Sequence, residues 1–384
     1  MFVSQLIRSL IELPFISSSR LITSTAHRTN QVPLELKSIN NTHATLLIDG
    51  KEIKYDWIFL RDSCQCSQCV DTSTRQKLHN TTDIPINIAP QQEGLKILND
   101  NNLEILWNQP LFNHDETTVH RSLYSSTWLR TYSSSKNIAR ARYFDRPSIY
   151  WNRKDIQHVN LHIQCDDYLH SDLGLYNVLK HLNDYGLVFI DNVQGEFAVE
   201  KLTERIGEIR HTFYGKSWNV KSTKQAINVA YTSQALGLHM DLLYFEAPPG
   251  LQFLHALTNS VQGGASYYAD SFHAIEILRR KDSKAFQSLS PFESDTTKDE
   301  FRQFIQAFQH FRNILEDPNN QLELILKKDQ CVIFHNRRIL HARREFDASS
   351  GSRWLKGCYT DLDNFKDRLR VFQEKFNPIS DVKV

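Results

Sequence analysis

A histidine and an aspartate two positions apart interrupt the apolar stretch "LGLHMDLLYFEAPPG", residues 236–250. Alternate side chains of a strand project to the same face, so His239 and Asp241 are expected to reach one point inside a barrel. With a second histidine from a distant strand they would form the facial triad that holds non-haem Fe(II). The segment "CVIFHNRRILHARREF" offers His335 and His341 for that role. A core histidine without a metal is the competing interpretation.

An arginine late in the chain supplies a second piece of chemistry. Arg353, in "SGSRWLKGCYTD", follows His341 by twelve residues, enough for the chain to turn and return on the adjacent strand. A buried guanidinium needs a carboxylate, either in a structural ion pair or on a bound co-substrate. A metal triad beside an arginine points to 2-oxoglutarate, which would chelate the metal with its keto-acid end and meet Arg353 with its far carboxylate.

Three of the six cysteines, Cys64, Cys66 and Cys69, lie together in "CQCSQC". They make a poor disulfide framework for a chain of 384 residues, and metal binding in a reducing compartment is the better interpretation. Three reduced cysteines without a ligand are the alternative.

The elements that must position these residues fall into two regions. Residues 34–131 contain short strands with polar turns, with hairpin signals at Asp49–Gly50 and across 99–102, which predicts a small β domain. Residues 132–165 lack a sustained period and are interpreted as a linker. In residues 166–384, helical patterns such as "AVEKLTERIGEIRHTFYG", with a stripe from Val199 to Phe213, alternate with apolar runs of strand length. The whole predicts a mainly β, α+β protein with a jelly-roll catalytic domain.

Composition bears on the partners and the compartment expected for the chain. Lys and Arg number 45 against 44 Asp and Glu, which gives no argument for nucleic acid as a partner. No run of 18 apolar residues is present, so a membrane span is not expected. Residues 1–33 carry three arginines, many Ser and Thr, and the single acid Glu12, as mitochondrial transit peptides do. We therefore expect the mitochondrial matrix, with a disordered leader and a cytoplasmic protein as the alternative.

The sequence resembles the gamma-butyrobetaine dioxygenase and trimethyllysine dioxygenase family, within the wider taurine-dioxygenase-like group, from about residue 45 to 372. The motifs that carry the resemblance are "FLRDSCQCSQC", "FYGKSW", "NVAYT", "LHMDLLYFEAPPGLQFLHAL", "SVQGGASYYADSF", "VIFHNRRILHARREF" and "RWLKGCYTD". It implies a double-stranded β-helix and hydroxylation with O2, 2-oxoglutarate and ascorbate as reductant. The implied iron ligands are His239, Asp241 and His341, and the implied 2-oxoglutarate site is Arg353 with Asn228 and Leu254. His335 stands where the family usually has aspartate and receives no role.

The resemblance also assigns the cysteines and four aromatic residues. Cys64, Cys66 and Cys69, with His79 ten residues later, would close a tetrahedral structural zinc site. The family builds a cage for a trimethylammonium group from aromatic faces, which attract a cation that cannot donate a hydrogen bond. The matching positions here are Tyr214, Trp218, Tyr231 and Tyr359. Each of these, judged alone, would more often be core.

Two departures from the family bear on the substrate. Leu242 stands where gamma-butyrobetaine dioxygenases usually carry tyrosine, and between Phe292 and Phe301 the chain has only "ESDTTKDE", where family members run longer. The resemblance implies hydroxylation of a trimethylammonium acid, first of all gamma-butyrobetaine to L-carnitine, by a homodimer. Trimethyllysine or another small acid remains open as the substrate. So does a catalytically impaired, zinc-stabilised homologue.

Overall fold

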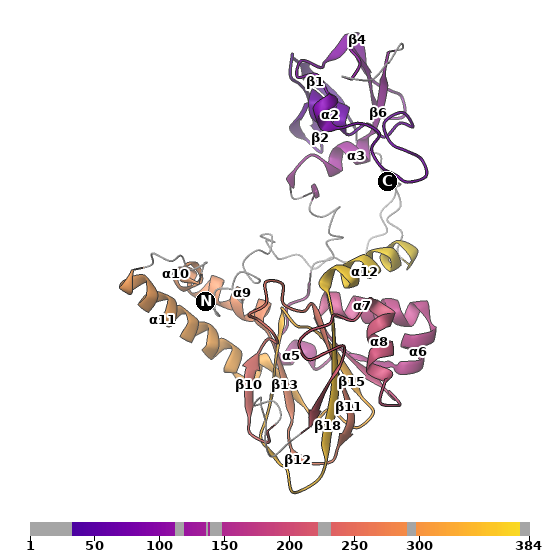
Figure 1. Cartoon of the computed structure of the whole chain (residues 1–384). Coiled ribbons are helices and arrows are strands. Elements are labelled where there is room, and N and C mark those ends of the chain that lie inside the picture. The colour runs from indigo at the N-terminus through magenta and orange to yellow at the C-terminus, as the bar shows by residue number, and fades with distance from the viewer. Residues whose placement is uncertain are drawn as a thin grey trace. The chain divides into compact units, whose positions relative to one another are not determined.

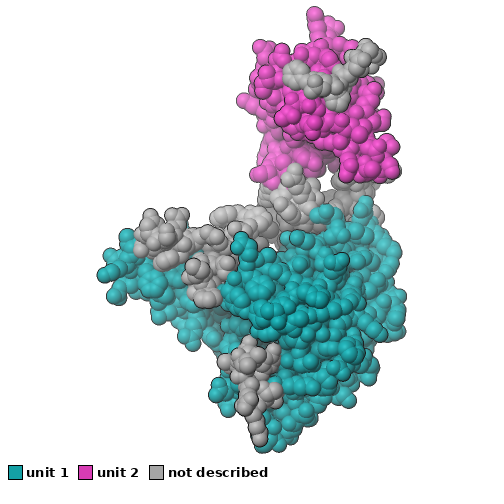
Figure 2. Space-filling view, viewed as in Figure 1, with its two compact units in different colours: residues 1–19, 146–378 teal, residues 20–145, 379–384 magenta. Residues whose placement is uncertain are grey.

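The structure is a computed structural model, shown in Figure 1. It describes residues 33–111, 119–135, 137–138, 148–221, 232–289 and 297–376. These residues form two compact units, unit 1 from residue 146 onward and unit 2 before it (Figure 2). The expected leader falls outside the described residues except at Pro33, as do Asn228, Tyr231 and Phe292.

Unit 2 is built on two antiparallel three-stranded sheets. Each is a meander of consecutive strands, β1-β2-β3 and β4-β5-β6. The predicted hairpin is confirmed: Ile48 pairs with Lys51, and Asp49 and Gly50 take the positive φ values, 51° and 73°, of a type I′ turn. The elements are β1 (Glu35–Ile39), β2 (His43–Ile48), β3 (Lys51–Asp56), α2 (Trp57–Asp62), η1 (Thr81–Asp83), β4 (Pro90–Ile97), β5 (Asn102–Trp107), β6 (Arg121–Ser125) and α3 (Ser126–Thr131).

Unit 1 contains the predicted jelly roll, made of a six-stranded and a four-stranded sheet. Their orders are β7-β8-β15-β11-β18-β9 and β10-β16-β13-β14. Buried residues from both sheets, among them Phe189, Phe334 and Tyr268, pack in one cluster between them. The strands are β7 (His162–Gln164), β8 (Leu187–Asp191), β9 (Trp218–Lys221), β10 (Leu236–His239), β11 (Leu251–Asn259), β12 (Gln262–Gly263), β13 (Ser266–Asp270), β14 (Gln321–Leu324), β15 (Cys331–His335), β16 (Ile339–Arg343), β17 (Phe346–Asp347) and β18 (Arg353–Thr360).

Helices surround this double sheet in two groups. Helices α6 (Cys165–His170), α7 (Asp172–Asp184), α8 (Ala198–Ile206) and α12 (Leu362–Phe376) share a core with the outer face of the six-stranded sheet (Figure 1). Helices α9 (Ser271–Lys281), α10 (Ser283–Ser288) and α11 (Lys298–Glu316) form a second core that includes Ala269 and Leu340 of the four-stranded sheet. Two short elements, α5 (Arg153–Ile156) and η3 (Pro318–Asn320), complete the unit. No helix of the described ranges is long and apolar enough to cross a membrane.

The structure corrects two expected boundaries. The helix predicted to extend to Phe213 ends at Ile206. Gly207, the next residue, adopts an extended backbone, and Phe213 is 64% exposed. Unit 1 begins before residue 166, because β7 pairs with β8 in the large sheet and Trp151 is fully buried. Three residues of pairing are too short to leave a periodic pattern, which is why this stretch looked like a linker.

Candidate metal centres and active site

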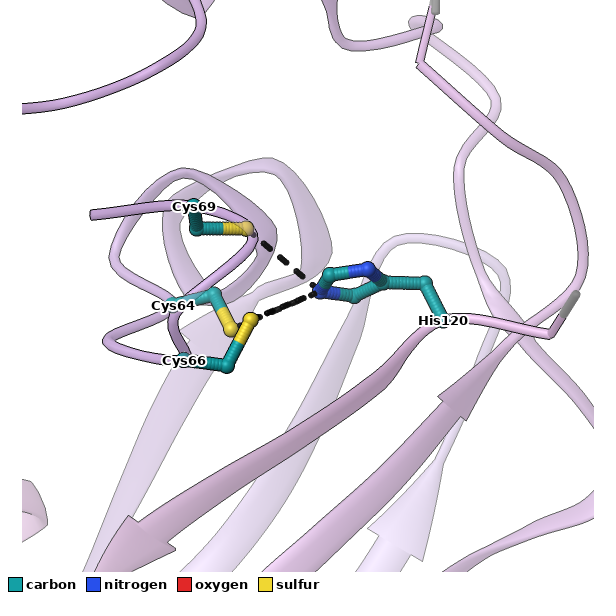
Figure 3. Close-up of side chains that lie close together, drawn as sticks. All are labelled: Cys64, Cys66, Cys69 and His120. Carbon is teal, nitrogen blue, oxygen red and sulfur yellow. Dashed lines mark hydrogen bonds between the residues drawn. The ribbon is translucent and has the colours of Figure 1, made fainter. Parts of the chain in front are cut away.

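Three cysteines and one histidine of unit 2 point toward one another (Figure 3). Nε2 of His120 lies 3.5, 3.7 and 3.5 Å from Sγ of Cys64, Cys66 and Cys69. In a tetrahedral zinc site with Zn–S near 2.3 Å and Zn–N near 2.0 Å, sulfur and nitrogen are separated by about 3.5 Å. The four residues therefore fit a zinc ion in both type and spacing.

The expected fourth ligand, His79, is not part of this cluster. Its Nε2 lies 3.7 Å from the carboxylate of Asp62. His120 is the fourth residue of the cluster instead. It directly precedes β6, and its carbonyl accepts a hydrogen bond from the backbone N–H of Trp107 at the end of β5. It lies 51 residues from Cys69 in sequence, and spacing alone gave no signal for it.

The electrostatics of the cluster favour a metal as well. A hydrogen bond from the Cys69 thiol lowers the pKa of Cys64, so a thiolate forms there readily. Nη1 of Arg61, a side chain with no exposed surface, donates to Sγ of Cys69 at 3.1 Å. A buried guanidinium beside sulfur would compensate the negative charge of three metal-bound thiolates.

In unit 1, β10 and β16 bring the two predicted histidines together. His239 and His341 are partners in the antiparallel register, and their ring centroids are 4.1 Å apart. Oδ1 of Asp241 lies 3.3 Å from Nε2 of His239 and 3.8 Å from Nε2 of His341. His335, the other histidine considered as the second triad histidine, is the last residue of β15. Its ring centroid lies 6.4 Å from that of Phe272.

Asp241 reaches this point by a route other than strand alternation. Strand β10 ends at His239, and the turn that follows carries Asp241. Asn336 holds that turn, because its Oδ1 accepts from the Asp241 backbone N–H and its Nδ2 donates to the Asp241 carbonyl, each at 3.0 Å. Asn336 has no exposed surface and was not identifiable from sequence.

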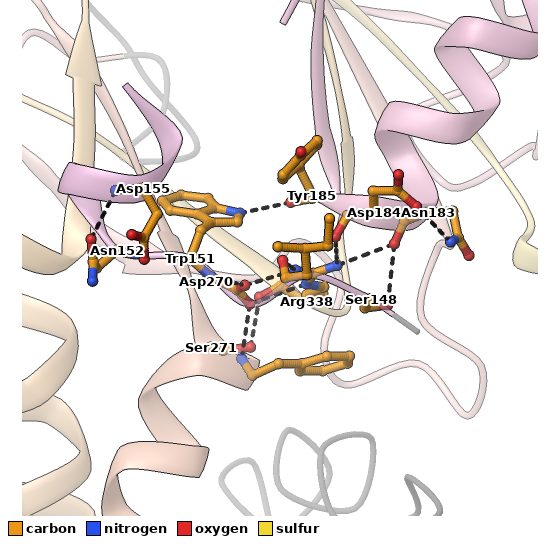
Figure 4. Close-up of polar contacts among 12 residues, drawn as sticks. Ser148, Trp151, Asn152, Asp155, Asn183, Asp184, Tyr185, Asp270, Ser271 and Arg338 are labelled. Atoms are coloured by element: carbon orange, nitrogen blue, oxygen red, sulfur yellow. Dashed lines mark hydrogen bonds and ion pairs between the residues drawn. The ribbon is translucent and has the colours of Figure 1, made fainter. Parts of the chain in front are cut away.

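A buried ion pair in turn anchors the loop that contains Asn336 (Figure 4). Nη2 and Nε of Arg338 donate to the carboxylate of Asp270 at 2.7 and 3.1 Å, and neither side chain is more than 1% exposed. The hydroxyl of Ser271 donates to the Arg338 carbonyl at 2.6 Å. The remaining Arg338 N–H groups donate to the carbonyls of residues 149, 183 and 184.

The donor set of the triad fits an iron ion. Nδ1 of His239 donates to the Gly237 carbonyl at 2.9 Å, which leaves Nε2 as the ring nitrogen that would bind a metal at the shared point. Burial raises the pKa of Asp241, but the hydrogen bond with His239 and the nearby imidazoles offset this, and the pKa lies well below its usual range. Burial lowers the pKa of His341 to about 3. A carboxylate and a neutral imidazole are the forms that bind a metal, and two nitrogens with one oxygen suit Fe(II).

Arg353, at the start of β18, is partly buried. Among the residues that the structure describes, its Nε has no hydrogen-bond partner and no acidic side chain forms an ion pair with it. Burial, and then the neighbouring Arg343, lower its pKa to about 10, so it stays charged near neutrality. A partly buried positive group with an enclosed Nε favours an anion. Leu254, on the adjacent strand β11, packs in the cluster between the sheets.

Three of the four aromatic candidates lie together. The rings of Trp218 and Tyr359 stack at 4.1 Å, and Tyr214 lies 6.1 Å from Trp218. Leu242, next to Asp241, joins this cluster. Tyr359 is 1% exposed, and its hydroxyl donates to Oδ2 of Asp241 at 2.6 Å. Tyr359 thus contacts the triad as well as the aromatic group, which spacing did not predict. The fourth candidate, Tyr231, lies outside the described residues.

Two family models match the chain. The one described as taurine catabolism dioxygenase TauD, TfdA family matches residues 152–290 and 287–359, which include the triad and Arg353. The one described as gamma-butyrobetaine hydroxylase-like, N-terminal matches residues 46–118, which include the three clustered cysteines. The two parts of the first match meet at 287–290, just before the short segment that precedes Phe301.

Relatives align over most of the chain. Dioxygenase str8 of Strobilurus tenacellus is 34% identical, over 84% of this chain and 86% of its own. Gamma-butyrobetaine dioxygenase of Pseudomonas sp. (strain AK-1) is 28% identical, over 85% of this chain and 92% of its own. Trimethyllysine dioxygenase, mitochondrial, of Mus musculus is 26% identical, over 87% of this chain and 88% of its own.

Proposed function

The chain belongs to the taurine catabolism dioxygenase TauD, TfdA family and is a 2-oxoglutarate-dependent dioxygenase, and from this premise we propose that it hydroxylates a small trimethylammonium acid. His239, Asp241 and His341 would hold the iron, and Arg353 the far carboxylate of 2-oxoglutarate. One observation carries the proposal: a partly buried arginine, with an enclosed Nε and no described acidic partner, lies in the same double sheet as a His-Asp-His cluster.

Bound iron and 2-oxoglutarate supply the oxidising chemistry, in which O2 is consumed, 2-oxoglutarate becomes succinate and CO2, and one substrate C–H bond becomes C–OH. The residues of the chain would position the substrate and exclude water from the site. Tyr214 and Trp218 would face the quaternary ammonium group, and Leu242 and Tyr359 would form an apolar wall beside Asp241 that excludes water. We propose Leu254 as a further wall of the 2-oxoglutarate site, and Asn228 and Tyr231, outside the described residues, as further contacts.

Gamma-butyrobetaine is our first choice of substrate. The family model matched by residues 46–118 and the Pseudomonas relative are both named for butyrobetaine chemistry. Trimethyllysine is the second choice, supported by the mouse relative. A catalytically impaired homologue is a further candidate, favoured by the division of the family match into two parts at residues 287–290, just before the short segment that precedes Phe301.

Further parts of the proposal concern the protein's setting. Cys64, Cys66, Cys69 and His120 would bind a structural zinc ion, since four protein ligands leave no coordination position open. The mouse relative named as mitochondrial supports the mitochondrial matrix, to which the composition of residues 1–33 would direct the chain. We also propose ascorbate as the reductant and a homodimer as the assembly.

Succinate formation tests the function. Purified protein without residues 1–33 is incubated with Fe(II), ascorbate and 2-oxoglutarate, alone or with gamma-butyrobetaine or trimethyllysine. Stimulation by one compound would identify it as the substrate. No stimulation by either, in protein that binds iron, would exclude both and favour a different substrate or impaired catalysis.

A matched variant separates the iron site from the fold. His239→Ala is expected to abolish iron loading and succinate formation while zinc content stays unchanged. Full turnover in His239→Ala would exclude His239 as an iron ligand.

A further inference from the structure

The two carboxylate oxygens of Asp241 have different surroundings. Oδ1 faces Nε2 of His239 at 3.3 Å and Nε2 of His341 at 3.8 Å. Oδ2 accepts two hydrogen bonds, from Nε2 of Gln252 at 2.7 Å and from the hydroxyl of Tyr359 at 2.6 Å. A carboxylate oxygen offers about two lone-pair positions, so these donors fill those of Oδ2.

The two donors are fixed by the sheet itself. Gln252 on β11 and Tyr359 on β18 are direct cross-strand partners, so their side chains leave the same face side by side. They are 2% and 1% exposed, which gives neither side chain a path into solvent. The ring of Tyr359 is held by its stack on Trp218. The backbone of Asp241 is held separately by Asn336.

We propose that Gln252 and Tyr359 are positioning residues that make Asp241 a one-oxygen metal ligand by occupying Oδ2. The inference rests on the proposed iron site. An octahedral ion with three protein ligands keeps three positions, of which 2-oxoglutarate needs two and O2 one. A carboxylate bound through both oxygens would fill one of these. The donors therefore protect the position that the co-substrates require.

The test removes the donors while it preserves shape. Gln252→Met keeps side-chain length without an N–H, and Tyr359→Phe keeps the ring without the hydroxyl. Each has a matched control in a buried residue away from the triad. Gln321, 3% exposed, donates to the Leu315 carbonyl at 2.8 Å, and Tyr168, with no exposed surface, donates to the Leu202 carbonyl at 2.7 Å. The controls are Gln321→Met and Tyr168→Phe.

The measurement is an anaerobic titration of the Fe(II)-loaded full chain with 2-oxoglutarate, followed by the charge-transfer absorption of the complex. The double variant is expected to bind 2-oxoglutarate about tenfold more weakly or worse, with a displaced absorption maximum, as changes around a metal ligand typically cause. Each single variant should show a smaller change in the same direction. The two controls should match wild type.

Three outcomes decide the matter. A double variant with the dissociation constant and absorption maximum of the controls would overturn the proposal. Should the double variant fail to fold, as judged by its zinc content and circular dichroism, the single variants decide by the same criterion. Wild-type protein that loads no Fe(II) would overturn the iron site itself, a failure distinct from the first because it appears before any variant is made.

Discussion

The buried charge of Arg61 lies beside a cysteine of the proposed zinc site. Zinc with three thiolates and a neutral imidazole carries a net charge of −1, and a charge without compensation is costly in a protein interior. The fully buried guanidinium of Arg61 donates to Sγ of Cys69 and would supply the compensating charge. It also orients that ligand, as residues around a metal ligand commonly do.

Replacing Arg61 is therefore expected to weaken zinc binding. Arg61→Met should lower the zinc affinity about 10–100-fold, measured by competition with a chromophoric chelator. Arg121→Met is the control in the same unit, because Arg121 is exposed and pairs with Glu104. Equal affinities in the two variants would show that Arg61 is needed only for packing.

The partly buried imidazole of His335, whose Nδ1 is enclosed, predicts a pH dependence of stability. Burial, and then the charges of Arg338 and Arg337, lower its pKa to about 3, against about 6.5 in an unfolded chain. The folded state keeps His335 neutral, so this group's contribution is present above pH 6.5 and is lost as the pH falls toward 3. Between pH 7.5 and 5.5 the loss is about 1.4 kcal/mol.

Urea unfolding at the two pH values checks this expectation. His335→Gln should lose about 1.4 kcal/mol less than wild type over that interval. His170→Gln, at an exposed histidine that is not in a core, should behave as wild type does. An identical pH dependence in wild type and His335→Gln would contradict the prediction.

Among the elements, the turn between β15 and β16 holds the site through two of its residues. It carries Asn336, which holds Asp241, and Arg338, whose ion pair with Asp270 fixes the turn to the N-cap of α9. Removing one partner of a buried pair leaves the other charge without compensation, at a cost of about 3–5 kcal/mol.

Arg338→Met should thus destabilise unit 1 by about 3–5 kcal/mol and speed hydrogen exchange at residues 336–341. The double variant Arg338→Met, Asp270→Leu should recover part of that stability, since no unpaired charge remains. A loss below about 1 kcal/mol in the single variant would show that other contacts hold the turn.

The elements also show what a sequence can predict. His239 and His341 were identifiable because both lie on strands. The strand expected beside that of His341 was wrong for Arg353, because β18 lies in the other sheet, between β11 and β9. His120 depends on the packing of β6 near a distant cysteine loop, and Gln252 depends on its register opposite Tyr359. Such non-local pairings leave no local period, so only the folded chain reveals them.

At the scale of the whole molecule, the two candidate metal sites belong to separate cores. The cluster of three cysteines and His120 lies in unit 2, with a core around Trp57 and Trp107, and the triad lies in unit 1. A closed tetrahedral site contributes directly to the folding free energy, so the loss of zinc should destabilise unit 2.

Metal content and hydrogen exchange test this separation. Cys66→Ser and His120→Ala should lose zinc and show faster exchange within residues 33–135, while Fe(II) binding and exchange within 148–376 stay as in wild type. His79→Ala should keep its zinc, because His79 is not at the cluster. Loss of zinc in His79→Ala with retention in His120→Ala would reverse the ligand assignment.

Strand β18 places on one face residues of the proposed 2-oxoglutarate site and of the aromatic cluster beside Asp241. Its inward residues alternate from Arg353 through Leu355 and Gly357 to Tyr359, and a Cβ on Gly357 would come 2.5 Å from Cζ2 of Trp218. A one-residue slip would turn all four outward at once. The site can therefore change its specificity through substitutions on this strand. It cannot do so through a change of length in residues 348–352 that shifts the register, and insertions in that turn should be selected against in active descendants of this chain.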